Sequence, residues 1–199
     1  MKKTMAALMA AILIFTLSGC EKPMTPGQTV SKMLDAVKAL DRETAAFYID
    51  YDRLMDYSEG DNLSDTDETT RLLVANLSYK ILSEEQNENT ATVKAEITNL
   101  DLKPVFSEYV KEAVQLIFDN ALSSQGGDGS EEDLREKMQT VFIELLKKQS
   151  ETTTAAVDLS LVRENNVWKV RMDDALQDAV FGGLSETIRT LVEENANPD

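Results

Sequence analysis

The most reactive side chain in this sequence of 199 residues is its single cysteine, Cys20. An ionised thiol is the strongest nucleophile among the protein side chains. Histidine, the usual acceptor for the thiol proton near neutral pH, is absent from the chain. Its absence excludes Cys-His and Ser-His nucleophile pairs and most zinc or copper sites. The role of Cys20 therefore depends on the residues that precede it.

The residues before Cys20 have the order of a secretory signal. Lys2 and Lys3 form a short basic region, and an apolar run follows at 5–17. A basic end, an apolar region and small residues before a cleavage site are typical of signal peptides. A retained membrane anchor needs about 20 apolar residues, and this run is shorter. We expect residues 1–19 to be a signal peptide that is removed.

The stretch Leu17-Ser18-Gly19-Cys20 resembles the lipobox of bacterial lipoproteins. The resemblance implies a diacylglycerol thioether on Cys20, cleavage before this residue and, in many bacteria, acylation (for example by palmitate) of its new amine. Two or more acyl chains anchor a protein stably, whereas one chain binds only marginally. It also implies a lipidated tether at 20–24 and a location on the extracytoplasmic face of the cell membrane, with no thiol left for catalysis.

The composition narrows the classes of partner. The chain carries a formal net charge of −16, and loss of two lysines with the signal peptide leaves −18. No Lys/Arg cluster appears, so we expect no nucleic-acid partner. Anionic lipid heads would repel the acidic chain, so attachment should depend on the lipid. The length and the 42% apolar content predict a single folded domain at 25–194, followed by a polar tail at 195–199.

The sequence pattern predicts helices followed by a β-hairpin in the first half of this domain. Thr25, Pro26 and Gln28 form the pattern of a capped helix start, and Asp41 is suited to cap a second helix. A third helix is predicted at 68–77. Alternating apolar and polar residues predict strands at 78–85 and 90–99, joined by a turn at 86–89.

The pattern of the second half predicts two helices followed by another β-hairpin. Pro104 is expected to open a long helix, and Ser130 is expected to cap a second one that ends near 149. Strands at 154–161 and 167–172 enclose a turn at 163–166, with Trp168 in the core. Asp173-Asp174 can cap a last helical segment, which Gly182-Gly183 either break or allow to pack closely. Seven residues are expected to share one face of the long helix: Phe106, Tyr109, Val110, Ala113, Val114, Ile117 and Ala121.

This order of elements predicts an α+β fold. We expect N-terminal helices packed on a curved antiparallel sheet of two hairpins, with a helical hairpin inserted between them. The segment 165–170 resembles an ending common in small bacterial lipoproteins with a cystatin-like, nuclear-transport-factor-two-like cone fold. The segment 175–184 is similar to one that follows this ending in some Gram-positive members. Asn166 stands where glycine is usual, and asparagine also tolerates a positive φ. That fold implies room for an apolar pocket, but no single function.

One group of side chains has the composition of a catalytic pocket. An aspartate base with a tyrosine donor is the arrangement used by ketosteroid isomerase. The alternative, which we favour, is that the rings belong to the core and the acids are solvated. The group consists of Phe47, Tyr48, Tyr51 and Tyr57 with Asp50, Asp52 and Asp56.

Other chemical signatures are missing from the sequence. The acidic stretches at 65–68 and 128–133 lack the glycine and glutamate positions of an EF-hand loop. No nucleophile elbow, dinucleotide fingerprint or phosphate-binding loop appears. We therefore expect no metal and no cofactor.

Three functions remain open. We favour a non-enzymatic, lipid-anchored extracytoplasmic domain that binds a protein or a small ligand. The second is a carboxylate-dependent isomerase or hydrolase with a pocket near 48–56. The third is a structural spacer of the cell envelope.

Overall fold

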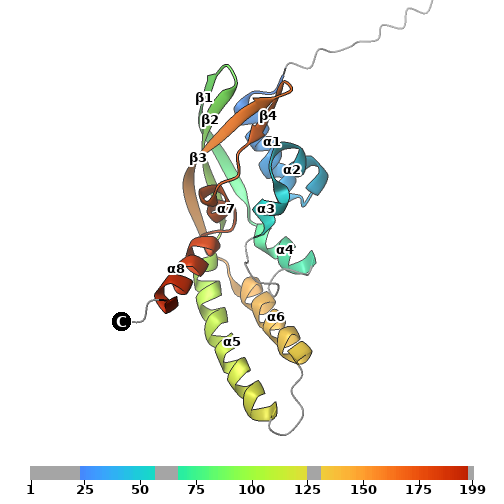
Figure 1. Ribbon diagram of the computed structural model, residues 1–199, viewed down its shortest axis with the longest axis vertical. Helices are drawn as coiled ribbons and strands as arrows, with labels where there is room; N and C mark the ends of the chain where they lie inside the picture. The colour runs from blue at the N-terminus through green and yellow to red at the C-terminus, as the bar shows by residue number, and fades with distance from the viewer. Residues whose placement is uncertain (1–22, 57–66, 125–130, 197–199) are drawn as a thin grey trace, which may run out of the picture.

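The computed structural model describes residues 23–56, 67–124 and 131–196 (Figure 1). The expected signal peptide, Cys20 and Tyr57 lie outside these residues. The chain has the predicted α+β class, with helices and one curved, open antiparallel sheet.

The N-terminal helices begin at the predicted caps. Thr25 and Gln28 form a reciprocal capping box with Pro26 in the first turn, and Asp41 accepts a hydrogen bond from the amide of Thr44. The hydrogen bonds from Thr44 hold the pKa of the Asp41 carboxyl below its usual value. The third predicted helix is shorter than expected, because it ends at Val74. The four helices are α1 (Pro26–Lys38), α2 (Arg42–Tyr48), α3 (Tyr51–Met55) and α4 (Asp67–Val74).

The two predicted hairpins join into one sheet with the strand order β1-β2-β3-β4. The middle pair connects Thr90 with Val162 at one end and Leu100 with Thr152 at the other, across the inserted helices. Asn165 and Asn166 take positive φ values of 50° and 65° in the tight turn. The value for Asn166 agrees with its place at a position where glycine is usual. The strands are β1 (Ser78–Asn87), β2 (Thr90–Leu100), β3 (Thr152–Glu164) and β4 (Val167–Val170).

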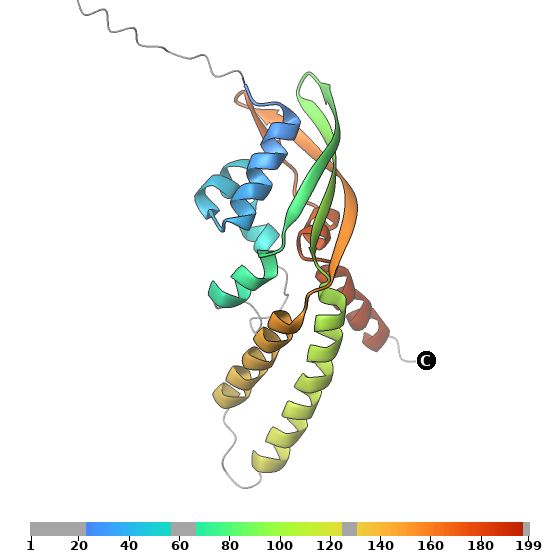
Figure 2. The ribbon, with the colours of Figure 1, turned by 180° about the vertical axis from the view of Figure 1, so that it is seen from behind.

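The inserted helices, α5 (Leu102–Ser124) and α6 (Glu131–Lys148), form a hairpin that we call the arm. Figures 1 and 2 show the arm projecting from the end of the sheet opposite to the start of α1. Helix α5 begins two residues before Pro104, because Asp101 Oδ1 accepts a hydrogen bond from the Lys103 amide at 3.2 Å. The predicted Ser130 cap lies outside the described residues.

The C-terminal part is two helices, α7 (Asp174–Val180) and α8 (Leu184–Ala196), because the glycine pair interrupts it. Asp173 caps α7 through the amide of Leu176. Gly182 has a φ of +55°, and a Cβ there would lie 1.7 Å from the Leu100 carbonyl oxygen. The pair therefore both breaks the helix and allows close packing. Helix α8 continues to Ala196, into the segment predicted as a polar tail.

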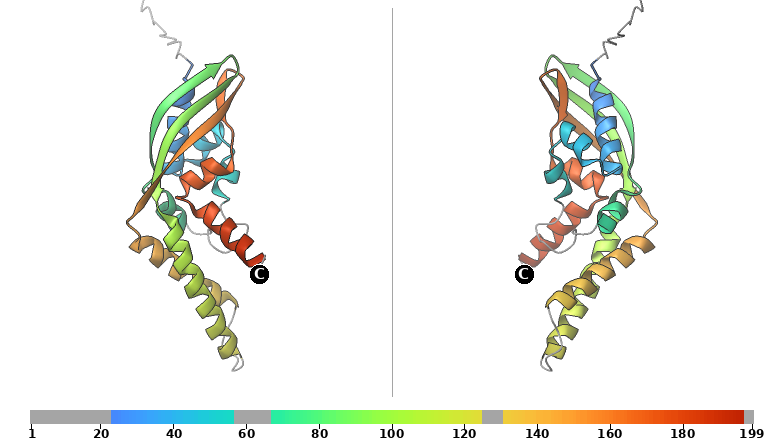
Figure 3. Two further views of the ribbon diagram at one scale, coloured as in Figure 1. Left: turned by 90° about the vertical axis from the view of Figure 1, so that its left-hand side faces the viewer. Right: turned by 90° about the vertical axis from the view of Figure 1, so that its right-hand side faces the viewer.

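The core lies between the sheet and α1, around which the strands curve (Figure 3). The alternation predicted for β2 is observed, since every second side chain from Ala91 to Ile97 is buried. Trp168 is buried, as expected. The buried stripe of α1 contains Val30, Met33, Leu34 and Val37.

One buried polar side chain, Asn99 near the end of β2, connects three elements. Its Nδ2 donates to the carbonyls of Leu73 in α4 and Val180 in α7, at 2.7 and 2.6 Å. Its Oδ1 accepts from the amide of Leu100 at 2.8 Å. The side chain is completely buried, so water cannot replace these bonds.

Replacement of Asn99 by alanine is expected to lower the free energy of unfolding by about 3 kcal/mol or more, because buried groups that lose their partner cost about 1–3 kcal/mol each. Urea unfolding followed by circular dichroism measures the change. The matched control is Thr154→Ala, which removes an exposed hydroxyl bonded to Thr98 and should cost no more than about 0.5 kcal/mol. Equal stability of the two variants would contradict the role of Asn99.

Candidate protein-interaction site

The carboxylates proposed for catalysis are exposed and already engaged in local structure. Asp50 caps α3 through the amide of Arg53, and both oxygens of Asp52 accept from Arg42 at 2.8 Å. Asp56 is the exposed residue that ends α3. A carboxylate that serves as a tuned base is normally withdrawn from water. The described residues therefore do not form the catalytic pocket that we held as the alternative from the sequence.

The aromatic members of that group are part of the packing. Tyr48 is buried in the core, and its ring meets Phe47 edge to face at 4.9 Å. Phe47 is half exposed, and the ammonium group of Lys169 lies over it and donates to its carbonyl. Burial raises the pKa of Tyr51 above its ordinary value, so its hydroxyl stays protonated. Core rings beside solvated acids are the arrangement that we favoured from the sequence.

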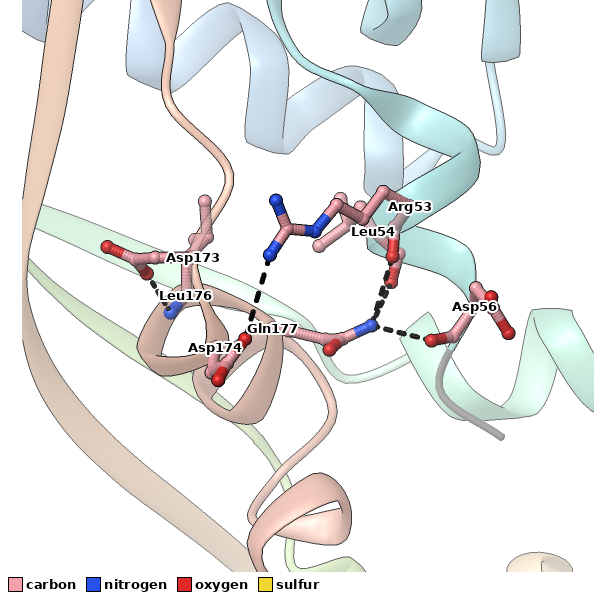
Figure 4. A network of polar contacts seen from close by, with 7 residues as sticks. All are labelled: Arg53, Leu54, Asp56, Asp173, Asp174, Leu176 and Gln177. Carbon is pink, nitrogen blue, oxygen red and sulfur yellow. Dashed lines mark hydrogen bonds and ion pairs between the residues drawn. The ribbon is translucent and has the colours of Figure 1, made fainter. Parts of the chain in front are cut away.

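A polar network holds α3 against α7 instead (Figure 4). Gln177 Nε2 donates to the carbonyls of Arg53, Leu54 and Asp56 at 2.9–3.1 Å. These carbonyls are among the groups that a helix end leaves without a partner. The Arg53 side chain also lies 3.8 Å from Asp174. The region near 48–56 is thus a structural junction.

Two buried rings pack the helices of the arm together near its base. Tyr109 of α5 meets Phe142 of α6 edge to face at 5.2 Å, and both rings are buried. Burial raises the pKa of Tyr109. Gln149 Nε2 donates to the Asp101 carbonyl at 2.7 Å, and the Asp101 amide donates to Glu151, so the two ends of the arm are joined.

Beyond Ala113, α5 exposes a continuous apolar surface, which we call the α5 face. It consists of Val114, Ile117, Phe118 and Leu122, each between 50% and 61% exposed. Their spacing of three and four residues puts them on one side of the helix. Contiguous exposed apolar patches are uncommon on soluble proteins and mark interaction sites.

Acidic residues border the α5 face. Glu108, Glu112 and Asp119 are exposed at a helical spacing that aligns them along one edge of α5. Lys111 lies 2.9 Å from Glu108. The α5 face is thus an apolar surface with an acidic border, a combination that can bind an apolar helix with a basic border.

The sequence interpretation missed the α5 face. Phe106, Tyr109 and Ala113 are buried as predicted, but Val114, Ile117 and Ala121, expected on the same face, are exposed. Phe118 and Leu122 were not singled out. The signal was present, because the apolar residues of 113–122 cover too wide an arc to be buried against one neighbouring helix.

No helix among the described residues is long and apolar enough to cross a membrane. In the same part of the chain, no three acidic, histidine or cysteine side chains are grouped so that they could hold a metal ion.

No protein-family model matches the chain, and no curated protein matches it in sequence. Among solved structures, a similar chain is YcdA of Bacillus subtilis, provisionally described as a lipoprotein. The two chains share 15% identity with a TM-score of 0.38. The match covers 85% of this chain and 47% of YcdA, so this chain spans about half the length of that protein. A likeness of this size establishes neither a shared fold nor a shared function.

Proposed function

We propose that this chain is a lipid-anchored, extracytoplasmic domain that binds another protein through the α5 face of its arm. The observation that carries the proposal is the row of four exposed apolar side chains on α5. We propose that the partner presents an amphipathic helix with an apolar face and a basic border. The cystatin-like relation belongs to the same proposal, supported by the motif at 165–170 and by the sheet that curves around α1.

The anchor at Cys20 rests on the lipobox resemblance and agrees with the shape of the molecule. Two residues, Glu21 and Lys22, lie between Cys20 and Pro23, the first described residue, so the Cα atoms of Cys20 and Pro23 are about 11 Å apart at most. The start of α1 lies at one end of the molecule and the arm at the other (Figure 1). Lipid attached at Cys20 would therefore put the membrane near the end farthest from the α5 face.

The border of the α5 face favours a protein over a lipid surface. Helices that bind in the membrane interface carry Lys and Arg on their polar side. The corresponding edge of α5 carries Glu108, Glu112 and Asp119, which anionic lipid headgroups repel.

The same border argues against a second copy of the chain. In a two-fold antiparallel pair of α5 helices, the acidic edge of one helix faces the acidic edge of the other. Like charges in this position destabilise the pair. A partner with a basic border removes the repulsion, so we favour a different protein.

The two other functions have less support. The isomerase or hydrolase requires the pocket near 48–56, whose carboxylates are exposed and engaged in caps and ion pairs. A spacer that binds no partner does not require the four exposed apolar side chains of the α5 face.

Replacement of Cys20 by alanine is expected to release the protein from the membrane, because the thiol that carries the diacylglycerol is lost. Membrane fractionation should find the wild type bound to the membrane. Intact mass spectrometry should find that its mass exceeds that of the unmodified mature chain by the mass of the attached lipid. Membrane attachment of Cys20→Ala equal to that of the wild type would contradict the anchor.

The double variant Ile117→Asp/Phe118→Asp is expected to lose the partner that the wild type retains, with at least a tenfold reduction in co-purified protein. Its unfolding midpoint should be close to that of the wild type, since both side chains are already exposed. The control is Leu82→Asp, which changes an exposed leucine on β1. Equal recovery with the double variant and the wild type would contradict binding at the α5 face.

A further inference from the structure

The sheet has an unpaired edge along most of β3. Strand β4 pairs only with residues 161–164 of β3, and one more bond joins Arg171 to Ser160. Within the described part of the chain, no strand pairs with the same side of residues 152–159. In Figure 1 this stretch forms the left-hand margin of the sheet. Alternate residues of an antiparallel strand direct their backbone groups to opposite sides. Ser160 bonds on the β4 side, so the residues that alternate with it present their backbone groups on the side where a further strand could pair: Thr152, Thr154, Ala156 and Asp158.

The other edge of the sheet, β1, differs from the β3 edge in its register and in its charged side chains. It carries a register irregularity between Ile81 and Ser83, and charged side chains at Lys80, Glu84 and Glu85. Glu84 also accepts hydrogen bonds from Gly27 and Thr25, which hold α1 beside the strand. Bulges, charges and covering elements are the devices by which proteins block unwanted pairing at an edge.

The β3 edge has fewer of these devices, although α7 and α8 lie beside the strand. The sequence 152–159 contains threonine, alanine, valine and leucine with a single charged residue, Asp158. It contains no lysine and no proline, and its register with β2 is regular. Its composition favours strand pairing, so the edge is suited to accept an additional strand.

A groove of about 460 Å³ lies beside this edge, between β3 and the helices α7 and α8. Ala155 and Val157 line it from the strand, and Ser185 lines it from α8. The Ser185 hydroxyl is buried and has no hydrogen-bond partner among the described residues. The volume falls in the range of ligand pockets, about 300–1,000 Å³. Alternate side chains of an added strand would enter the groove.

The charges around the groove define what it can accept. Asp174, Asp178 and Glu186 line it, with Arg189 as the only cation among its lining residues. Within the described residues, Asp174 forms a long, exposed ion pair of 3.8 Å with Arg53, and Glu186 forms one of 3.9 Å with Lys103. A basic segment would gain complementary contacts here, whereas an acidic segment would be repelled.

We propose that the open edge of β3 and its groove bind an extended, positively charged peptide segment of a partner protein by strand addition. Backbone hydrogen bonds to residues 152–159 supply the pairing, and the acidic lining of the groove selects basic side chains. This site is separate from the α5 face and does not depend on it.

Fluorescence anisotropy with the full-length chain in detergent tests the proposal. The probe is a twelve-residue peptide that alternates threonine or valine with lysine; the same peptide with glutamate in place of lysine is its counterpart. The lysine peptide should bind, more weakly as salt increases, and the glutamate peptide should bind at least tenfold more weakly. No binding of the lysine peptide, or equal binding of both, would overturn the proposal.

Two variants on adjacent positions of β3 locate the site. Ala155→Lys introduces a cation into the groove and should weaken binding of the lysine peptide at least tenfold. Ala156→Lys places the same charge on the opposite, exposed face of β3 and should change binding less than twofold. Equal effects of the two variants would refute the location.

Hydrogen exchange of the wild type gives a test that does not depend on how the variants fold. The bound lysine peptide should slow exchange of amides in 152–159 and leave the outer edge of β1 unchanged. Binding without protection of 152–159, or association of two copies of the chain through this edge, would overturn strand addition of a peptide.

Discussion

The buried side chain of Asn99 determines how the other parts of this molecule meet. It lies one residue before the end of β2 and bonds to backbone groups that end α4 and α7. Backbone carbonyls at helix ends need partners, and here no water can reach them. A single amide thus fixes the directions in which two helices leave the sheet, close to the point where the arm begins.

The junction around Asn99 explains how the arm can project without collapsing onto the sheet. The Leu102 amide at the start of α5 donates to Gly182, and the two ends of the arm are joined through Asp101. The rings of Tyr109 and Phe142 then pack the two helices together near the base. Because the base is held by these contacts, the distal half of α5 can leave an apolar face exposed. Elsewhere in the described chain, the large apolar side chains are mostly buried.

Local features of the fold could be predicted from the sequence, because their causes are local. Thr25, Asp41 and Asp173 cap helices as their positions indicated, and Asn166 occupies the turn position that requires a positive φ. Features that depend on distant residues could not be predicted. Pairing of β2 with β3 crosses the whole arm, and the partners of Asn99 and Gln177 come from elements far away in the chain.

The α5 face shows a different limit of sequence interpretation. Apolar spacing predicted that residues of α5 share a face, but spacing alone does not tell a face that contacts the core from one that awaits a partner. For Asp50 and Asp52 the favoured interpretation, solvated acids beside core rings, agrees with the structure, because they serve a cap and an ion pair. The anchor at Cys20 remains a prediction from the sequence.

Photo-crosslinking in living cells tests the central claim most directly. A photoreactive residue in place of Phe118 lies on the α5 face, and one in place of Leu82 lies on an exposed part of β1. Binding of a protein partner at the α5 face predicts a discrete protein adduct from position 118 that is absent from position 82. No adduct from position 118, or the same adducts from both positions, would contradict it.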